Sequence, residues 1–281
     1  MQDIRIFAMQ MNSTHRFAMS SKYRLFFLFT FLGSAVLQLT STAQDKQDDR
    51  KTFSIFYPSY SINLPSFDMK KRFGLSHSIG AGYTLMFKNN WLVNVEGNFL
   101  FGKNIKHADS LFRFIVTRDG NIIDQSGNYT QVALSERGFT FWLKAGKLIP
   151  FGKPGQGSGL LLMTGAGMMQ HKIRIDVSQN SAPQLRSSYK KGYDHMCNGP
   201  AITEFIGYQY LQPAKKINFF AGLEFTFAWT QSRRAYYFSE MIRPNERRLI
   251  CFPGSRWAGF SLLTGDQVVN IIITSSVRQG I

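Results

Sequence analysis

The sequence predicts an all-β protein: an eight-stranded antiparallel up-and-down transmembrane β-barrel. Three observations lead to this prediction. A short apolar leader precedes the main part of the chain, and aromatic-rich segments of strand length follow it. The links between these segments are alternately long and short. Membrane barrels have long loops at one end and short turns at the other, whereas a soluble sandwich has no reason to show this asymmetry.

The leader has the layout of a secretory signal peptide, predicted over residues 1–43, with Met19 as a second candidate start. Lys22 and Arg24 form its basic region, and residues 25–37 form its apolar region. This apolar run is shorter than the roughly 20 residues that a membrane-spanning helix needs. The leader therefore predicts export from the cytoplasm.

The rest of the chain divides into two predicted parts. Residues 44–51 are polar and are expected to be a flexible mature N-terminus, and residues 52–281 are expected to form the barrel. The formal net charge is +16. Export argues against a nucleic-acid partner, so the phosphates of outer-membrane lipids and lipopolysaccharide are the expected partners of this charge.

Seven segments are predicted strands, and three of them alternate apolar and polar residues most clearly with the period of two that is typical of half-buried strands. The predicted strands span residues 53–64, 76–87, 91–101, 139–146, 159–175, 201–210 and 217–230. In the last of these, Phe219, Leu223 and Phe225 share one face, and Glu224 and Thr226 share the other. In a membrane barrel the apolar face meets lipid and the polar face lines the interior.

Every second predicted link is long. The long links are residues 102–138, 176–200 and 231–248, together with a medium loop at residues 65–75 on the same side. The opposite side has short turns at residues 88–90 and 211–216 and a moderate turn at residues 147–158. If the mature N-terminus lies in the periplasm, every long loop falls on the extracellular side.

The residues from about 249 onward depart from this pattern. The segment 251–256 shows no strand period, and seven strands would leave an open edge in lipid. One hypothesis is a reading-frame error near Arg248, because an allowed one-base shift alternates again and ends in aromatic residues. In that case Cys251 is an artefact and a disulfide with Cys197 disappears. If the frame is genuine, the eighth strand is expected within residues 257–273.

Several short motifs resemble small outer-membrane β-barrel proteins of Bacteroidota-type bacteria, within the porin-like or OmpA-like barrel superfamily. They are GAGY at residues 80–83, EGNFLFG at 96–102, QHKI at 170–173, KGYD at 191–194 and TQSRR at 230–234. The resemblance covers roughly residues 53–248 and implies the barrel fold and a cell outer-membrane location. It implies little about activity, because such barrels serve many roles.

Three charged residues fall on the predicted inner face of the barrel: Glu96, Lys144 and Glu224. An eight-stranded barrel is just wide enough for side chains to fill it, and buried charges must be paired. These residues are expected to form a salt-bridged plug, with a proton or ion path as the alternative.

Candidate catalytic residues are few. His77 and Ser78 begin the second strand, and small outer-membrane lipid A deacylases place a histidine and a serine close together. Sequence identifies no third group, and polar residues at a strand rim are the simpler interpretation. His171 and His195 have no metal-ligand spacing around them.

Basic residues in the predicted long loops are expected to face lipopolysaccharide phosphates, with ordinary solvation of the loops as the alternative. They include Lys103, Arg113, Arg186, Lys190, Lys191, Arg233 and Arg234.

Together these features predict an integral outer-membrane barrel without enzymatic activity, serving as a structural or accessory subunit of an envelope assembly or secretion complex. A lipid A-modifying hydrolase and a narrow pore are the alternatives. No cofactor and no metal is expected, and an envelope protein complex is a candidate partner.

Overall fold

A computed structural model describes residues 52–106, 108–151, 158–177, 182–186, 188–211, 218–244 and 247–264. Within the last range, the side chains of residues 247–248 and 259–264 are not described. The predicted signal peptide at residues 1–43 and the predicted mature N-terminus at residues 44–51 lie outside the described part.

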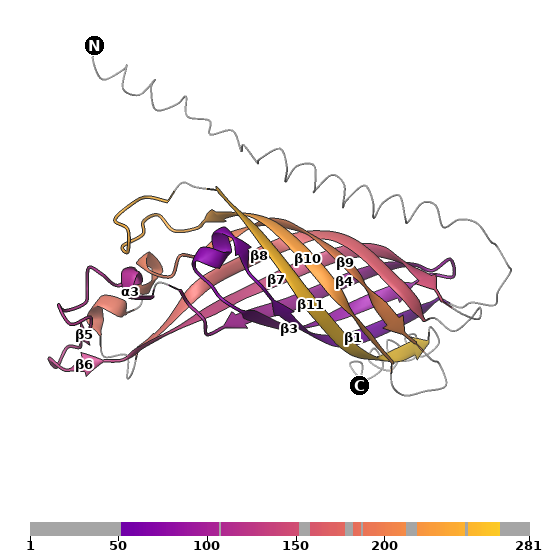
Figure 1. The fold of residues 1–281 in the computed structure, drawn as a ribbon, viewed down its shortest axis with the longest axis horizontal. Coiled ribbons are helices and arrows are strands. Elements are labelled where there is room, and N and C mark those ends of the chain that lie inside the picture. The colour runs from indigo at the N-terminus through magenta and orange to yellow at the C-terminus, as the bar shows by residue number, and fades with distance from the viewer. Residues whose placement is uncertain are drawn as a thin grey trace, which may run out of the picture. The chain divides into compact units, whose positions relative to one another are not determined.

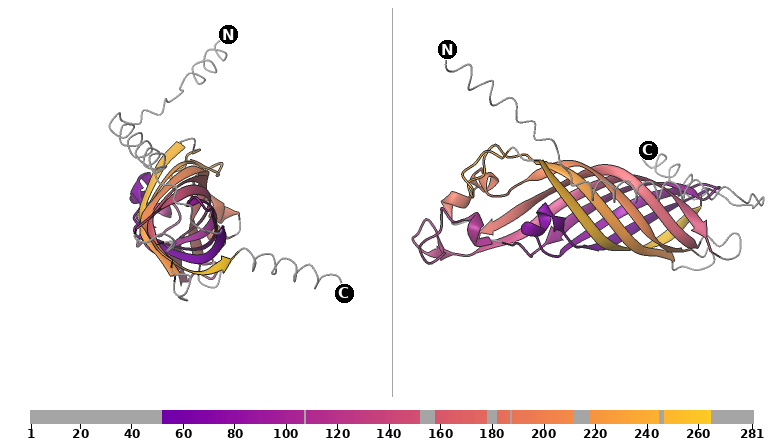
Figure 2. Two further views of the ribbon diagram at one scale, coloured as in Figure 1. Left: turned by 90° about the vertical axis from the view of Figure 1, so that its right-hand side faces the viewer. Right: turned by 45° about the horizontal axis from the view of Figure 1, so that its top comes forward.

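Eight long strands form a closed antiparallel ring (Figure 1; Figure 2, left). They are β1 (Phe53–Asn63), β3 (Ser76–Met86), β4 (Trp91–Gly102), β7 (Val132–Pro150), β8 (Gly159–Val177), β9 (Cys197–Tyr210), β10 (Asn218–Ser232) and β11 (Arg247–Thr264). Each strand pairs with the next one along the chain, and β11 pairs back with β1. The predicted eight-stranded up-and-down barrel is confirmed.

The remaining elements are short and lie in the long links at one end of the barrel (Figure 1). They are β2 (Ser66–Phe67), η2 (Asp68–Lys71), α3 (Ala108–Leu111), β5 (Ile122–Ile123), β6 (Tyr129–Thr130), η4 (Pro183–Leu185) and η5 (Tyr189–Gly192). Among the described residues, no helix is long and apolar enough to cross a membrane.

The closing strand corrects one expectation. We expected no strand period from residue 249, yet Ile250, Phe252 and Arg256 are buried inside the barrel while Trp257 is 43% exposed on the outside. The apolar and polar residues of this strand alternate only weakly in the sequence, because an inner face accepts apolar, polar and charged side chains alike. The expectation that the chain as printed supplies only seven strands is therefore wrong, because β11 is the eighth and pairs with β1. The reading-frame hypothesis concerns the gene and stays a prediction.

Two strands are longer than their sequence pattern indicated. β7 was expected over residues 139–146 but runs from Val132 to Pro150, and β9 begins at Cys197 rather than at residue 201. Residues 132–135 of β7 pair only with β8, beyond the end of β4. Such a segment projects past the ring, where no lipid imposes an apolar outer face.

The outer face of the ring is apolar. Its exposed large side chains include Phe56, Ile79, Leu85, Val93, Val95, Phe99, Phe139, Phe141, Leu143, Ile206, Phe219, Leu223, Phe225 and Trp257. They come from β1, β3, β4, β7, β9, β10 and β11, so the apolar surface extends around the barrel. We call this surface the apolar belt.

The interior is filled in three layers. At the short-turn end an apolar cluster includes Tyr57, Leu92, Leu148, Phe205 and Phe220. Polar and charged side chains occupy the middle. At the long-loop end a second apolar cluster joins barrel residues to loop residues, among them Trp142, Met169, Phe73, Leu111 and Leu185.

Candidate functional site

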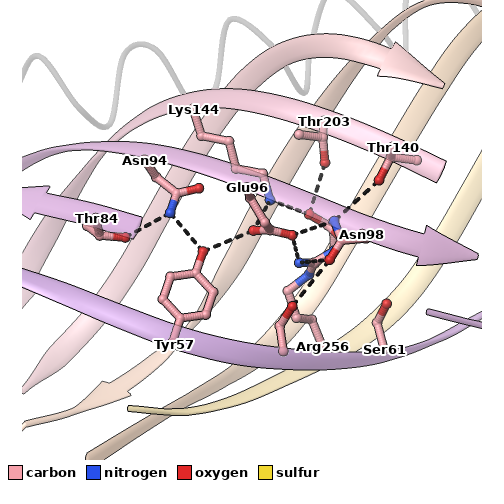
Figure 3. A network of polar contacts seen from close by, with 12 residues as sticks. Tyr57, Ser61, Thr84, Asn94, Glu96, Asn98, Thr140, Lys144, Thr203 and Arg256 are labelled. Carbon is pink, nitrogen blue, oxygen red and sulfur yellow. Dashed lines mark hydrogen bonds and ion pairs between the residues drawn. The ribbon is translucent and has the colours of Figure 1, made fainter. Parts of the chain in front are cut away.

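Four charged side chains meet in the middle of the barrel (Figure 3). Lys144 Nζ of β7 donates to Glu96 Oε2 of β4 at 3.0 Å and to Glu224 Oε1 of β10 at 2.7 Å. Arg256 of β11 contacts both carboxylates, with its Nε 2.8 Å from Glu224 Oε2. Two cations and two carboxylates form a neutral group, which is the condition for keeping charges in a low-dielectric interior.

Neutral side chains complete this group, which we call the charge network. Tyr57 Oη donates to Glu96 Oε2 at 3.0 Å, and Asn98 Nδ2 donates to Glu96 Oε1 at 2.7 Å. Thr203 Oγ1 donates to Glu224 Oε1 at 3.2 Å. Each carboxylate thus accepts bonds from two cations and from at least one neutral donor, so its lone pairs are satisfied without water.

The reach of Tyr57 depends on a glycine. Tyr57 lies opposite Gly82 of β3, and a Cβ atom built on Gly82 would stand 2.4 Å from the Tyr57 hydroxyl oxygen. The missing side chain at Gly82 therefore leaves the space that the phenol ring of Tyr57 occupies. The Tyr57 hydroxyl donates to Glu96 Oε2, and it accepts a hydrogen bond from Asn94 Nδ2 at 2.7 Å.

The charge network is closely packed within the barrel interior. The cavity beside Arg256 and Trp142 measures about 20 Å³, which is room for roughly one water molecule. The two apolar layers lie on either side of the network. Buried apolar side chains thus bound the polar middle of the described interior at both ends.

The structure places the three inner-face charges as the sequence suggested and brings them together: Glu96, Lys144 and Glu224 are 1%, 1% and 4% exposed. Sequence reasoning missed Arg256, which is 3% exposed, and Tyr57. Arg256 could have been found from the two-residue spacing of Ile250, Phe252 and Arg256.

His77 and Ser78 do not share a site. The His77 ring lies on the outside, where Nδ1 is 2.7 Å from Tyr60 Oη and the ring stacks between Tyr60 and Phe101. Ser78 is buried inside, with its Oγ 2.5 Å from Ser61 Oγ. Consecutive strand residues point to opposite faces, so this pair cannot act together on one substrate.

The four long links fold together at one end of the barrel, and we call them the loop cap. Lys106 N donates to Arg72 O at 2.7 Å and ties the first long link to the second. Phe238 N donates to Gly192 O at 2.9 Å and ties the fourth to the third. The cap is thus a packed layer over the end of the barrel.

One ion pair and one buried histidine anchor the loop cap. Arg234 Nε donates to Asp194 Oδ1 at 2.7 Å, and a second contact makes the pair bidentate. This bonding raises the pKa of Arg234. His195 Nε2 lies 2.7 Å from Ser239 Oγ, and its ring stacks on Tyr237 with centroids 4.0 Å apart. Burial, and secondly the positive charge of Arg72, lower the pKa of His195 from 6.5 to about 3.

The basic residues expected to face lipopolysaccharide all lie in the loop cap or at the strand ends beneath it. Arg234 is committed to Asp194 and is not free to face lipid phosphates. Arg233 contacts Asn198, and Arg186 Nη2 donates to Gln125 Oε1 at 3.1 Å. Lys103, Arg113 and Lys191 are exposed, and Lys190 is half-buried.

The two cysteines do not form a disulfide with each other. Cys197 and Cys251 are both buried free thiols. No group of three or more histidine, cysteine, aspartate or glutamate side chains is arranged to hold a metal in the part of the chain that the structure describes.

No protein-family model and no curated protein sequence matches the chain. Several solved structures are similar, and three of them follow. Ail, the attachment invasion locus protein of Yersinia pestis, is 10% identical at a TM-score of 0.39, covering 76% of this chain and 100% of that one. Neisserial surface protein A is 8% identical at 0.39, covering 74% and 96%. The outer membrane protein OprG from Pseudomonas aeruginosa is 11% identical at 0.35, covering 78% and 97%.

These identities and TM-scores are too low to carry an argument about function. The barrel architecture of this chain rests on its own strand pairing, in which β11 returns to β1.

Proposed function

We propose that this chain is an integral outer-membrane protein with a sealed barrel, acting without catalysis as a structural or accessory subunit of an envelope complex. The observation that carries the proposal is a closed, filled barrel with an apolar belt outside and paired charges inside.

The apolar belt supports the membrane location. Phe141, Leu143 and Leu223 are each more than half exposed, and similar side chains surround the ring. Soluble monomers rarely expose contiguous apolar patches beyond a few hundred Å². A closed barrel satisfies every backbone group through its strand pairing, so the same surface is stable in a bilayer. Together with the export leader, the belt favours the outer membrane.

The filled interior argues against a conducting role. A pore needs a water-filled lumen, which barrels gain at larger strand numbers. Here Lys144 and Arg256 bridge the two carboxylates across the lumen, and apolar clusters lie above and below them.

The polar contacts of the loop cap argue against hydrolysis. The pair of Ser239 and His195 has the right separation for a nucleophile and its base, at 2.7 Å. However, His195 Nδ1 has no acidic partner among the described residues, and a pKa of about 3 makes the imidazole a poor base near neutral pH. We assign this pair a packing role.

The loop cap is the feature suited to a partner. Its backbone is tied by contacts between links, so it presents a preformed surface, and preformed surfaces lose less conformational entropy on binding. The cap is also the part of the barrel that projects out of the lipid in this proposal.

Three measurements test the proposal. Fractionation should recover the mature protein with outer membranes, and recovery in the soluble periplasm would refute the membrane assignment. Planar bilayers containing the purified barrel should show no steady single-channel current, since steady conductance would restore the pore. Crosslinking and pull-down from native membranes should then retrieve a stable envelope partner, and its absence would remove the accessory role.

A further inference from the structure

We propose that a basic cavity in the loop cap is a binding site for a phosphorylated saccharide. The cavity measures about 290 Å³, and residues of all four long links line it together with Ile173 of strand β8. Its basic wall consists of Lys71, Arg72, Lys106 and Arg113. None of the roles given above to the charge network or the apolar belt uses these residues.

The charge balance of the cavity favours an anion. Four cations line it, and the acidic side chain among the lining residues is Glu240. Lys71 is also 3.4 Å from Asp68, but both side chains are exposed, at 79% and 43%, so this pair is weak. The wall retains a net positive charge, and a concave wall focuses the field of its charges onto a ligand.

Arg72 provides the strongest single argument that the cavity binds an anion. Its backbone is fixed by bonds from its N to Met69 O at 3.0 Å and from Lys106 N to its O at 2.7 Å. Its side chain is only half-exposed, and it has no ion-pair or hydrogen-bond partner among the described residues. A guanidinium group offers five donors in a planar fork that matches phosphate or carboxylate oxygens.

His195 adds a second, independent observation. This side chain lines the cavity and is 6% exposed. Its Nε2 contacts Ser239, while its Nδ1 has no partner in the described part of the chain. An unpaired buried polar atom at a cavity wall indicates a site that is completed by a solvent molecule or a ligand.

The size and the remaining walls limit the ligand further. Small-molecule pockets run from about 300 to 1,000 Å³, so this cavity is at the small end. Ile105, Leu111 and Ile173 supply apolar surface to the lining, and Ser110 is also among the lining residues. A phosphate group with one attached sugar ring fits this combination, because the ring has apolar faces and a hydroxylated rim. The phosphate could belong to a membrane glycolipid or to a free sugar phosphate.

The test uses the full chain, refolded in a phosphate-free non-ionic detergent, and isothermal titration calorimetry. The probes are glucose 6-phosphate, glucose, bisphosphorylated lipid A in mixed micelles, and the same lipid A after enzymatic dephosphorylation. The key variant is Arg72→Gln. Its matched control is Arg118→Gln, which removes an exposed arginine from the same loop cap outside the cavity wall.

We expect binding of at least one phosphorylated probe and none of its phosphate-free counterpart. Arg72→Gln should weaken that binding about tenfold to hundredfold, as for the loss of a charge-assisted hydrogen bond, and Arg118→Gln should leave it within about twofold. Binding of glucose 6-phosphate would show that a free sugar phosphate is also a ligand. Binding of lipid A alone would show that the ligand is a glycolipid of the outer leaflet.

Two results would overturn the proposal. One is that neither phosphorylated probe binds the wild-type barrel. The other is that Arg118→Gln weakens binding as much as Arg72→Gln, since the attraction is then a diffuse property of the cap. A heat-modifiability gel shift, unchanged in both variants, shows that the barrel has folded. The assay uses purified protein, so its outcome does not depend on the accessory role proposed above.

Discussion

Replacing Lys144 with methionine should destabilise the barrel strongly. The substitution keeps an unbranched side chain of similar length, so it creates little empty volume. It removes the contacts of 3.0 Å and 2.7 Å to Glu96 and Glu224 and leaves Arg256 as the cation facing two buried carboxylates. The interior then carries one uncompensated negative charge.

The magnitude follows from these distances. At an effective dielectric constant of about 20, each contact contributes roughly 5 to 6 kcal/mol of Coulomb attraction. Desolvation of the ammonium group cancels much of this sum, and removing one partner of a buried pair usually costs about 3 to 5 kcal/mol. We therefore expect Lys144→Met to lower the free energy of unfolding by about 3 to 5 kcal/mol.

The matched double variant separates charge from packing. Lys144→Met with Glu224→Gln restores neutrality, with Glu96 still paired to Arg256, and should recover about 2 kcal/mol of the loss. Lys88→Met, in the exposed turn between β3 and β4, should change stability by no more than about 0.5 kcal/mol.

The assay is equilibrium urea unfolding of the barrel in lipid vesicles, followed by tryptophan fluorescence. The reasoning fails if Lys144→Met costs less than about 1 kcal/mol. It also fails if the double variant is as unstable as the sum of the two single variants, because the charges would then not be coupled.

Three further predictions concern the loop cap and the tail. His195 has a folded pKa of about 3 against an ordinary 6.5, so its neutral form contributes stability that is complete above pH 6.5 and declines as the pH falls toward 3. Proteolysis of the cap should accelerate from pH 7.5 to 5 in wild type, and His195→Gln should flatten this dependence. At pH 7.5, Asp194→Asn should accelerate proteolysis of the cap, because it leaves Arg234 without its ion-pair partner. Asp176→Asn breaks an exposed pair with Arg174 and should leave the rate of proteolysis unchanged. The reading-frame hypothesis predicts a one-base discrepancy on resequencing the codons of residues 247–276, and a clean in-frame read contradicts it.

The strands could be predicted from the sequence because the alternation of apolar and polar residues is a local pattern. A period of two distinguishes Phe219, Leu223 and Phe225 from Glu224 without any knowledge of neighbouring strands. Link lengths are likewise a property of the chain alone. The limits of β7 were missed because its outer end pairs only with β8, outside the ring, and carries no lipid-facing pattern.

The charge network could be predicted from the sequence only in part. An inward position for Glu96 and Glu224 followed from their place on the polar face, and the need for compensating charge followed from burial. The identity of the partners did not, because Lys144 lies 48 and 80 residues from them and Arg256 lies 160 residues from Glu96. Contacts at such separations depend on register, which no single segment encodes.

The sequence by itself therefore determined the class of fold, the inner and outer faces of most strands, and the end of the barrel at which the long loops gather. Only the tertiary structure decided that residues 247–264 close the ring, that Arg256 completes the charge network, and that Arg72 lies beside His195 at a basic cavity. The physical reason is the same in each case. Alternation is imposed on each strand separately by lipid and interior, whereas closure, charge pairing and the cavity arise when strands and loops distant in the chain pack together.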